Sequence, residues 1–373
     1  MREGWEIKKL GEVCEIYQPK TISSEQLVMD GNYPVYGANG IIGRYNQYNH
    51  EESEVLVTCR GATCGTINIS VPYSWINGNA MVVRPTDISK ISKQYLRHVL
   101  NSVDWKNVIT GAAQPQITRQ SLSPVPIPIP PLPLQEKIVS ELDLLSGVIE
   151  KKRQQLKELD NLAHSIFYDM FGDPITNEMG WEVKKLGEVC EITSSKRIFA
   201  HEYTENGIPF YRGKEISEKS KGNPITVELY ISPERYKDIK ENFGVPSIGD
   251  MLVTAVGTIG NIWVVDIETP FYFKDGNVVW LRIKDCTDSV YFRYILTILI
   301  NEYKTKMANG CAYSALTIAN LKEMPINVIP LPLQQSFAAK VEAIEQQKAL
   351  IKQSLAETET LFNSRMEHYF GEE

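Results

Sequence analysis

The sequence predicts an α+β protein in which two similar mixed α/β domains lie in tandem. Each domain is followed by a long α-helix, and the two helices pair as an antiparallel coiled coil. Three observations lead to this prediction: the 373-residue chain repeats itself, two long stretches carry apolar residues at helical spacing, and the rest alternates short β-branched runs with Gly, Asn and Pro turns. The expected parts are a first domain (1–134), a first helix (135–172), a second domain (173–333) and a second helix (334–373).

The internal repeat is the strongest of these signals. Thirteen residues recur with a single change, Ile7 to Val183, and two shorter segments recur in the same order. The edges of the two copies are therefore alike, whereas their interiors differ, and the second copy carries an insertion within 212–246. Duplication followed by drift is the plainest explanation. Drift alone would not leave the edges of both copies nearly identical while their interiors diverge. We therefore favour two copies that perform one task on two different targets. The repeated segments are 4–16 and 180–192, 131–135 and 330–334, and 171–172 and 370–371.

Two segments without interior proline predict the long helices. From Gln135 to Tyr168 the apolar residues recur at alternating intervals of four and three, with Lys152 in the one missing position. This heptad spacing is typical of a coiled coil, and the prolines before Gln135 predict an extended lead-in. Packing of each helix on its own domain is the alternative, but a long apolar stripe favours pairing. The predicted core positions are Ile138, Leu142, Leu145, Ile149 and Leu156 in the first helix, and Phe337, Val341, Ile344, Ile351 and Leu355 in the second.

Within each domain, one helix is expected late in the sequence, followed by a glycine-containing loop. The helices are expected at 93–103 and 290–307, and the loops at 111–116 and 310–315. Short runs of β-branched and apolar residues predict strands. These strands are expected at 55–58, 66–69, 80–83, 262–265 and 277–281.

Composition limits the classes of function. The formal net charge is −7, and the four expected parts carry +1, −2, −3 and −3, which argues against a protein that coats nucleic acid without selectivity. The six cysteines form no Cys-x-x-Cys pair, which favours free thiols over a zinc site. The first residues lack the apolar core of a signal peptide, and no apolar run reaches the ~18 residues of a membrane span. We therefore expect a cytoplasmic protein.

Sequence motifs of several enzyme classes are absent. There is no Walker-type phosphate loop, no G-x-G-x-x-G fingerprint after a strand, no Asn/Asp-Pro-Pro-Tyr/Phe methyltransferase site and no nucleophile elbow. The five histidines show no metal-binding spacing. We therefore expect a recognition protein rather than an enzyme, with no catalytic residue and no metal site in this chain.

The ordered double occurrence of G-W-E-[IV]-K-K-L-G-E-V, P-L-P-L-Q and a long helix ending in Phe-Gly resembles the specificity subunit of type I restriction-modification systems. The resemblance covers essentially the whole chain, through the repeat edges and the two helices. It implies that the divergent interiors are target recognition domains, each of which reads one half of a bipartite double-stranded DNA sequence. It also implies that the helices set the spacing between the two halves and dock the methyltransferase subunits.

The same resemblance implies partners and a cofactor outside this chain. Two copies of a methyltransferase (modification) subunit, which bind S-adenosylmethionine and modify adenine, are expected to dock on it. A motor and restriction subunit completes the complex, and no cofactor is expected in this chain. Two other interpretations stay open: a non-catalytic two-domain scaffold that binds proteins or glycans, and a cryptic nuclease or methyltransferase.

Candidate DNA contacts follow from residue type and position. In the first domain, Arg44–His50 mixes a cation with aromatic and amide side chains, and Arg60 precedes a glycine that permits close approach to a groove. In the second domain, cations cluster where the insertion begins. A polar surface loop, a structural turn or a solvated lysine run would explain the same residues. The candidates are Arg44, Tyr45, Asn46, Gln47, Arg60, Gln114, Gln116, Arg119, Arg212, Lys214, Lys219, Lys221 and Lys274.

Residues that are identical in both copies are expected to serve the scaffold, since residues that read different bases should differ. Trp5 and Trp181 are expected to be core anchors or partner contacts. Arg84 and Arg282 are expected to be structural or to bind phosphate.

Overall fold

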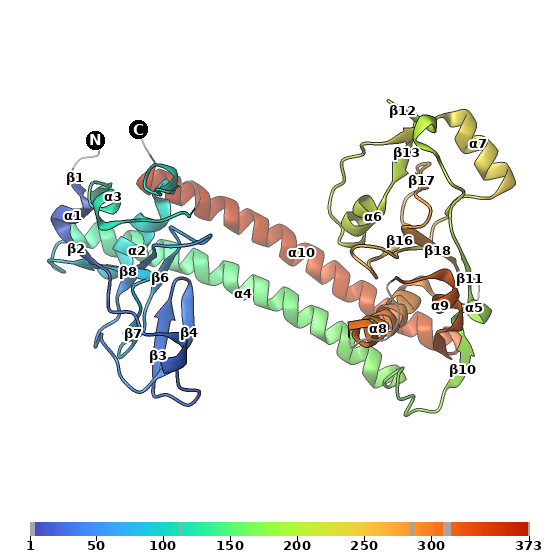
Figure 1. Ribbon diagram of the computed structural model, residues 1–373, viewed down its shortest axis with the longest axis horizontal. Coiled ribbons are helices and arrows are strands. Elements are labelled where there is room, and N and C mark those ends of the chain that lie inside the picture. Colours follow the sequence, from blue (N-terminus) through green and yellow to red (C-terminus); the bar gives the residue numbers. More distant parts are fainter. Residues whose placement is uncertain (1–3, 112–113, 284–286, 309–314, 372–373) are drawn as a thin grey trace. The chain divides into compact units, whose positions relative to one another are not determined.

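The computed structural model describes residues 4–111, 114–283, 287–308 and 315–371. It divides into two compact units: the first is Met1–Gln155 with Ile351–Glu373, and the second is Leu156–Leu350. Each unit therefore combines the domain of one repeat with the first part of the helix that follows it and the last part of the other repeat's helix. The mixture of sheets with two long helices confirms the predicted fold class (Figure 1).

The first unit contains a two-stranded ribbon and two sheets. The ribbon pairs β1 (Glu6–Lys9) antiparallel with β9 (Pro126–Ile129). An antiparallel sheet has the order β2 (Cys14–Tyr17), β8 (Ala80–Pro85), β5 (Val55–Thr58) and β6 (Ile67–Ile69). A smaller sheet has the order β4 (Gly40–Tyr45), β3 (Tyr33–Gly37) and β7 (Trp75–Ile76), with β3 and β7 parallel. The helices are α1 (Leu10–Val13), α2 (Lys93–Ser102) and α3 (Arg119–Leu122), with 3₁₀ turns η1 (Ser24–Gln26) and η2 (Trp105–Asn107).

The second unit repeats this plan. The ribbon pairs β10 (Glu182–Lys185) with β19 (Pro325–Val328), and the antiparallel sheet has the order β11 (Glu191–Thr193), β18 (Val278–Arg282), β15 (Met251–Thr254) and β16 (Ile262–Val264). The other sheet has the order β12 (Tyr203–Thr204), β14 (Tyr230–Ile231), β13 (Ile208–Tyr211) and β17 (Tyr272–Phe273). The remaining elements are α5 (Leu186–Val189), η3 (Ala200–Glu202), α6 (Gly213–Ser220), α7 (Pro233–Asn242), α8 (Ser289–Ala308) and α9 (Ile318–Glu323).

The strands and helices predicted inside the domains are confirmed, with bounds that differ by no more than two residues. The range 212–246, within which the insertion is expected, contains α6, β14 and α7. In the first unit, α2 buries Tyr95, Leu96 and Val99 in the same hydrophobic cluster as residues of β5 and β8, because their spacing places them on one face of the helix. Of the two expected glycine loops, residues 112–113 and 310–314 lie outside the described residues.

The long helices begin earlier than predicted. α4 spans Leu132–Phe171 and α10 spans Leu331–Phe370, 40 residues each. Pro133 and Pro332 therefore lie in a first helical turn, and the expectation of an extended lead-in up to Gln135 is wrong there. The reason is that the N–H groups of a first turn have no partner inside the helix, so the donor that proline lacks is not missed, and its fixed φ suits the helix.

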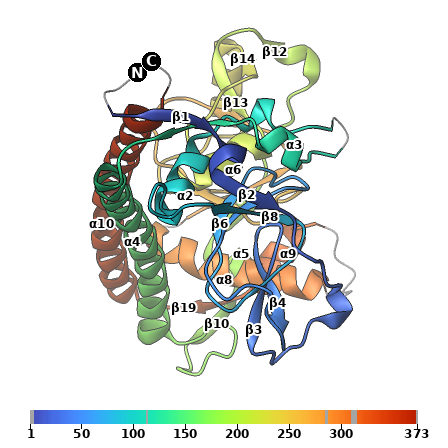
Figure 2. The ribbon, with the colours of Figure 1, turned by 90° about the vertical axis from the view of Figure 1, so that its left-hand side faces the viewer.

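Within each unit, α4 and α10 pack side by side and run antiparallel (Figures 1 and 2). In the first unit, the Lys152 ammonium donates to the Ser354 carbonyl at 2.8 Å and to Thr358 Oγ1 at 2.9 Å. In the second unit, the Lys348 ammonium lies 2.6 Å from an Asp160 carboxylate oxygen. Residues later in α4 thus contact residues earlier in α10, which confirms the antiparallel pair.

The predicted heptad stripe is the covered face of both helices. Lys152 occupies the missing apolar position because its ammonium finds oxygen acceptors on α10, as a polar residue in a coiled-coil core must. The buried members of the stripe are Ile138, Leu142, Ile149, Phe337, Val341 and Ile344, and the half-buried members are Leu145, Leu156, Ile351 and Leu355.

Each long helix also packs on a different domain at each end. Ile138 near the start of α4 belongs to the first unit's core, whereas Phe167 near its end belongs to the second unit's core. α10 does the reverse, with Phe337 in the second core and Phe370 packed against the first. Pairing with the other helix and packing on the domain, which the sequence posed as alternatives, therefore occur together.

His50 in the first unit is a buried histidine that its neighbours hold neutral. Its Nε2 lies 2.9 Å from Tyr17 Oη, and its Nδ1 lies 2.6 Å from Asn49 Oδ1. Asn49 Oδ1 also accepts the Ile76 N–H, so it acts as an acceptor, and His50 donates from Nδ1 and accepts at Nε2. Burial, and next the positive charge of Arg84, lower the pKa of His50 to about 4.

The stability of the first unit should therefore fall in mild acid. An unfolded histidine titrates near 6.5, so the stability that neutral His50 contributes is complete above pH 6.5 and is lost as the pH falls toward 4. We expect a loss of about 2 kcal/mol from this group between pH 7.5 and 5. Urea unfolding at both values should show a smaller loss in the His50→Gln variant. An equal loss in variant and wild type would contradict the assignment.

Candidate nucleic-acid interface

In the first unit, the loop between β5 and β6 presents Arg60 from a fixed backbone. The Cys59 N–H donates to the Asn79 carbonyl at 3.1 Å, which anchors the residue before Arg60. Gly65 ends the loop with φ of +88° and lies against the Trp105 ring, where an added Cβ would come within 2.7 Å of the indole. Only glycine meets both conditions, so the course of this loop depends on it.

Arg60 and Gln116 lie side by side at this loop. They form an isolated antiparallel bridge, next to the hydrogen bond from the Ile117 N–H to the Cys59 carbonyl at 3.0 Å. Residues that are directly opposite in an antiparallel pair send their side chains to the same face. Both side chains are exposed, and Arg60 forms no hydrogen bond or ion pair through its side chain with any residue that the structure describes.

Three further polar residues neighbour this pair in the chain or the fold. Gln114 is exposed two residues before Gln116, and Arg119 is exposed as the first residue of α3. Lys106 is exposed in η2, directly after the tryptophan that covers Gly65. The sequence offered no motif at Lys106, because only folding brings η2 to the loop.

The other predicted DNA segment of the first domain, on and after β4, is partly structural. The Arg44 guanidinium donates to two backbone carbonyls of its own domain, at 2.5 and 3.0 Å. Tyr45 is half-buried and packs edge-on against Trp75, with ring centroids 5.3 Å apart. These contacts explain both residues without DNA. Asn46 and Gln47 are exposed, and their contact with DNA stays a prediction.

In the second unit, carboxylates neutralise part of the predicted basic cluster. Arg212 pairs with buried Glu215 at 2.7 Å and with Glu228 at 2.8 Å, and Lys214 pairs with Glu228 at 3.1 Å. Contact with a phosphate would require Lys214 to leave its partner or share it. Sequence spacing could show the cations of the insertion but not which carboxylates the fold places against them.

The other three predicted cations of this unit differ in their surroundings. Lys221 pairs with Glu218 at 2.9 Å, and the Lys219 ammonium lies 5.4 Å from the centre of the Trp263 ring. Lys274 is half-buried, and its backbone N–H donates to the Tyr211 carbonyl at 2.9 Å. The structure thus does not gather the second-domain candidates into one unpaired basic patch within the described residues, and their role stays a prediction.

The loop between β15 and β16 is the second unit's counterpart of the Arg60 loop, with different side chains. The Leu316 N–H donates to the Ala255 carbonyl at 3.3 Å, as the equivalent pair does in the first unit. The backbone framework is therefore repeated while the exposed residues change. The counterpart of Arg60 is Val256, and that of Gln116 is Ala315.

The two shared arginines and Trp181 have contacts that serve the scaffold. Arg84 contacts buried Glu54 at 2.8 Å, and Arg282 contacts Glu191 at 3.3 Å. The structural interpretation of these arginines is therefore the one that the geometry supports. Trp181 is half-buried, and its indole N–H donates to the Phe171 carbonyl at 2.8 Å, as expected of a core anchor.

Neither a metal site nor reactivity of Cys14 is found among the described residues. No group of three His, Cys, Asp or Glu side chains among them could hold a metal ion. Burial raises the pKa of the Cys14 thiol to about 12, so it is not a reactive thiolate. No described helix is both long and apolar enough to cross a membrane. The cysteines described are Cys14, Cys59, Cys64 and Cys190, all free, and the other two lie outside the described residues.

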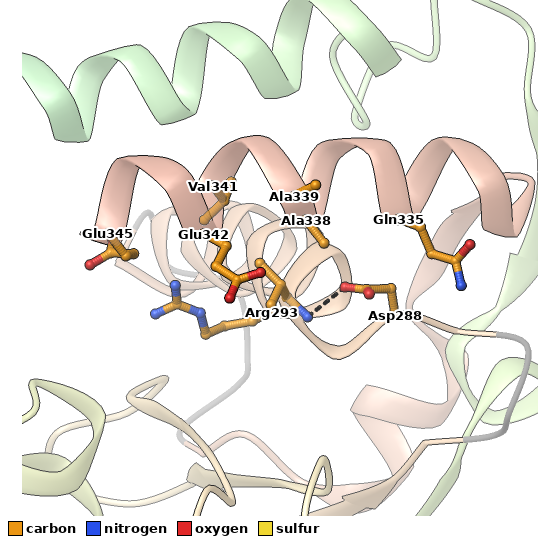
Figure 3. Close-up of a pocket in the computed structure, with 9 residues that line it drawn as sticks. Asp288, Arg293, Gln335, Ala338, Ala339, Val341, Glu342 and Glu345 are labelled. Atoms are coloured by element: carbon orange, nitrogen blue, oxygen red, sulfur yellow. Dashed lines mark hydrogen bonds between the residues drawn. The ribbon is translucent and has the colours of Figure 1, made fainter. Parts of the chain in front are cut away.

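A groove of about 550 Å³ lies between α8 and α10 in the second unit (Figure 3). Asp288, Glu342 and Glu345 line it, and Arg293 is the one cation among its lining residues. The Asp288 carboxylate is also the N-terminal cap of α8, accepting the Val290 N–H at 2.9 Å. Three carboxylates repel phosphates, so this groove is unsuited to a DNA backbone.

Comparison with known proteins decides which family has this architecture. The family model described as the type I restriction modification DNA specificity domain matches residues 2–161 and 178–360, one match for each repeat. The chain belongs to this family. The interpretation as a specificity subunit rather than an enzyme is thereby confirmed.

Similar proteins and structures agree over the whole length. A putative type I restriction enzyme specificity subunit of Haemophilus influenzae is 29% identical over 98% of this chain and 95% of its own length. A type I restriction enzyme specificity subunit of Methanocaldococcus jannaschii is 22% identical over 92% of this chain and 86% of its own. The S subunit of a type I system from M. genitalium has the same fold, with a TM-score of 0.64 and 16% identity. The match covers 99% of this chain and 96% of that subunit. A chain from a structure of a type I R-M system has a TM-score of 0.58 at 19% identity. The match covers 99% of this chain and 98% of that one.

Proposed function

We propose that this chain is the DNA-specificity subunit of a type I restriction-modification complex. Each domain reads one half of a bipartite double-stranded target, the paired helices set the spacing between the halves, and the chain performs no chemistry. Membership of the specificity family over both repeats carries the proposal. The repeated framework with unlike exposed loops supports it, because it carries two different recognition surfaces on one scaffold. Since both lie on one chain, the second binding event is intramolecular.

Two matching exposed strands support the docking of two copies of a methyltransferase subunit. β1 and β10 are exposed at every residue, and their sequences differ only at Ile7 and Val183, which are 57% and 50% exposed. The fold explains other repeated positions: Leu10 is buried, and Gly11 packs so closely on Ser123 that a Cβ would lie 2.8 Å from it. Folding does not require Ile7 and Val183 to be similar, because both side chains are exposed. Docking of the same partner on each repeat would require this similarity.

The remaining components lie outside this chain. In the proposed complex, the methyltransferase subunits bind S-adenosylmethionine and transfer its methyl group to adenine, and a motor and restriction subunit is recruited for cleavage. The described residues of this chain contribute recognition and support only.

Co-expression of this chain with the methyltransferase subunit of the same system tests the proposal. We expect methyladenine at one split motif, present only when both proteins are made. The affinity of the purified complex for that motif should fall steeply with salt, because each neutralised phosphate releases counterions. A scaffold for proteins or glycans would show no such affinity. Methylation of the same motif without this chain would contradict the proposal.

A further inference from the structure

We infer that Arg60 and Gln116 read two adjacent base pairs in the half-target of the first domain, Arg60 a guanine and Gln116 an adenine. The inference rests on the proposed function and extends it, since it assigns bases to two residues.

The backbone holds both residues in place before any DNA binds. The Gly61 N–H donates to the Pro115 carbonyl at 3.2 Å, which closes the loop over the segment that carries Gln116. Gln116 and Thr110 exchange two backbone hydrogen bonds of 2.8 Å. Side chains on a fixed backbone lose less entropy when they bind, which is what a reading contact needs.

The spacing of the pair suits neighbouring base pairs. Opposite residues of an antiparallel pair have Cβ atoms about 4.5–5.5 Å apart, and their side chains leave the same face. Successive base pairs lie about 3.4 Å apart along the helix axis. An arginine makes two hydrogen bonds to O6 and N7 of guanine, and a glutamine makes two to N6 and N7 of adenine.

The lack of an internal partner within the described part of the chain distinguishes Arg60 from Arg44 and Arg212, a feature that it shares with exposed Arg119. Arg44 is engaged by backbone carbonyls and Arg212 by two carboxylates, whereas the Arg60 guanidinium has no such partner among the described residues. Arg60 can therefore bind DNA without breaking an internal contact. A base contact, unlike a phosphate contact, must also differ between two domains that read different halves.

The second domain meets that requirement. Val256 and Ala315 occupy the matching places on the repeated framework, and neither side chain can donate a hydrogen bond. Val256 is 50% exposed and offers an apolar contact of the kind that a thymine methyl group takes. The two halves of the target should therefore differ at this place.

The chain itself supplies the variants for the test. Arg60→Val and Gln116→Ala import the residues that the second domain carries at the same places, so the framework is known to accept them. Each variant is co-expressed with the methyltransferase subunit, and the methylated motif is read by single-molecule sequencing. Arg60→Val should remove the requirement for guanine at one position of one half and leave at most a preference for thymine, and Gln116→Ala should relax the adjacent adenine. Discrimination at each position should fall roughly 10-fold to 100-fold in binding assays.

Lys151→Gln, which removes an exposed cation from α4, is the control and should leave the motif unchanged. An unchanged motif in Arg60→Val, with affinity lowered equally for all sequences and a shallower salt dependence, would assign Arg60 to a phosphate and overturn the inference. Relaxation in both halves, or at two positions that are not adjacent, would also overturn it. If the wild-type pair methylates no motif, the proposed function itself fails.

Discussion

Replacing Arg84 by leucine is expected to lower the free energy of unfolding of the first unit by about 2–4 kcal/mol. The Glu54 side chain is only 1% exposed, and Arg84 is its closest charged partner at 2.8 Å, with Lys93 at 3.8 Å. Removing the guanidinium leaves a buried carboxylate with one distant cation. The expected cost reaches below the usual range for broken buried pairs, because Lys93 remains and Arg84 is itself 40% exposed.

The repeat provides a matched control for this variant. Arg282 is the same residue in the second copy, but its partner Glu191 is 59% exposed, so Arg282→Leu should cost only about 1 kcal/mol. Unfolding of both variants by urea, followed by fluorescence and circular dichroism, measures the difference. Equal losses would show that the burial of Glu54 does not govern the effect.

Replacing Phe167 by alanine is expected to destabilise the second unit by about 3–5 kcal/mol. Phe167 lies near the end of α4, is 0% exposed, and packs on Phe171, Tyr291 and Phe337 with ring centroids 5.1–6.0 Å apart. The alanine variant removes the ring from a cluster that joins three helices and leaves a cavity there. Calorimetry should show the second unit unfolding at a lower temperature while the first unit is less affected.

Tyr168→Ala is the neighbouring control. Its side chain is 42% exposed, so we expect a loss well below that of Phe167→Ala. If the two variants lose the same stability, the end of α4 does not anchor the second unit in the way that the structure describes.

The order of the elements could be predicted from the sequence because the repeat and the heptads are patterns along the chain. Ile138 and Phe337 stand at positions that spacing alone marks as core, and both are buried. Pro133 misled the prediction because proline is excluded from helix interiors but accepted in a first turn. The attachment of Phe167 to the second core could not be read either, since it depends on which domain the helix end reaches.

The candidate site was only partly readable, for a different reason. Residue type marked Arg44, Arg60 and Arg212 equally, but their partners are set by tertiary structure. In the folded protein, Arg44 donates to backbone carbonyls and Arg212 pairs with carboxylates. It also brings Lys106 to the Arg60 loop through the packing of Trp105 on Gly65, for which the sequence holds no signal.

The most direct test of the central claim, that each domain reads its own half of the target, is a domain exchange. Residues 20–120 are replaced by the equivalent segment of a related specificity subunit, and the hybrid is co-expressed with the same methyltransferase subunit. Single-molecule sequencing then gives the methylated motif. We predict that one half of the split motif changes while the other half and the spacer length stay the same. A motif in which both halves change would contradict the account.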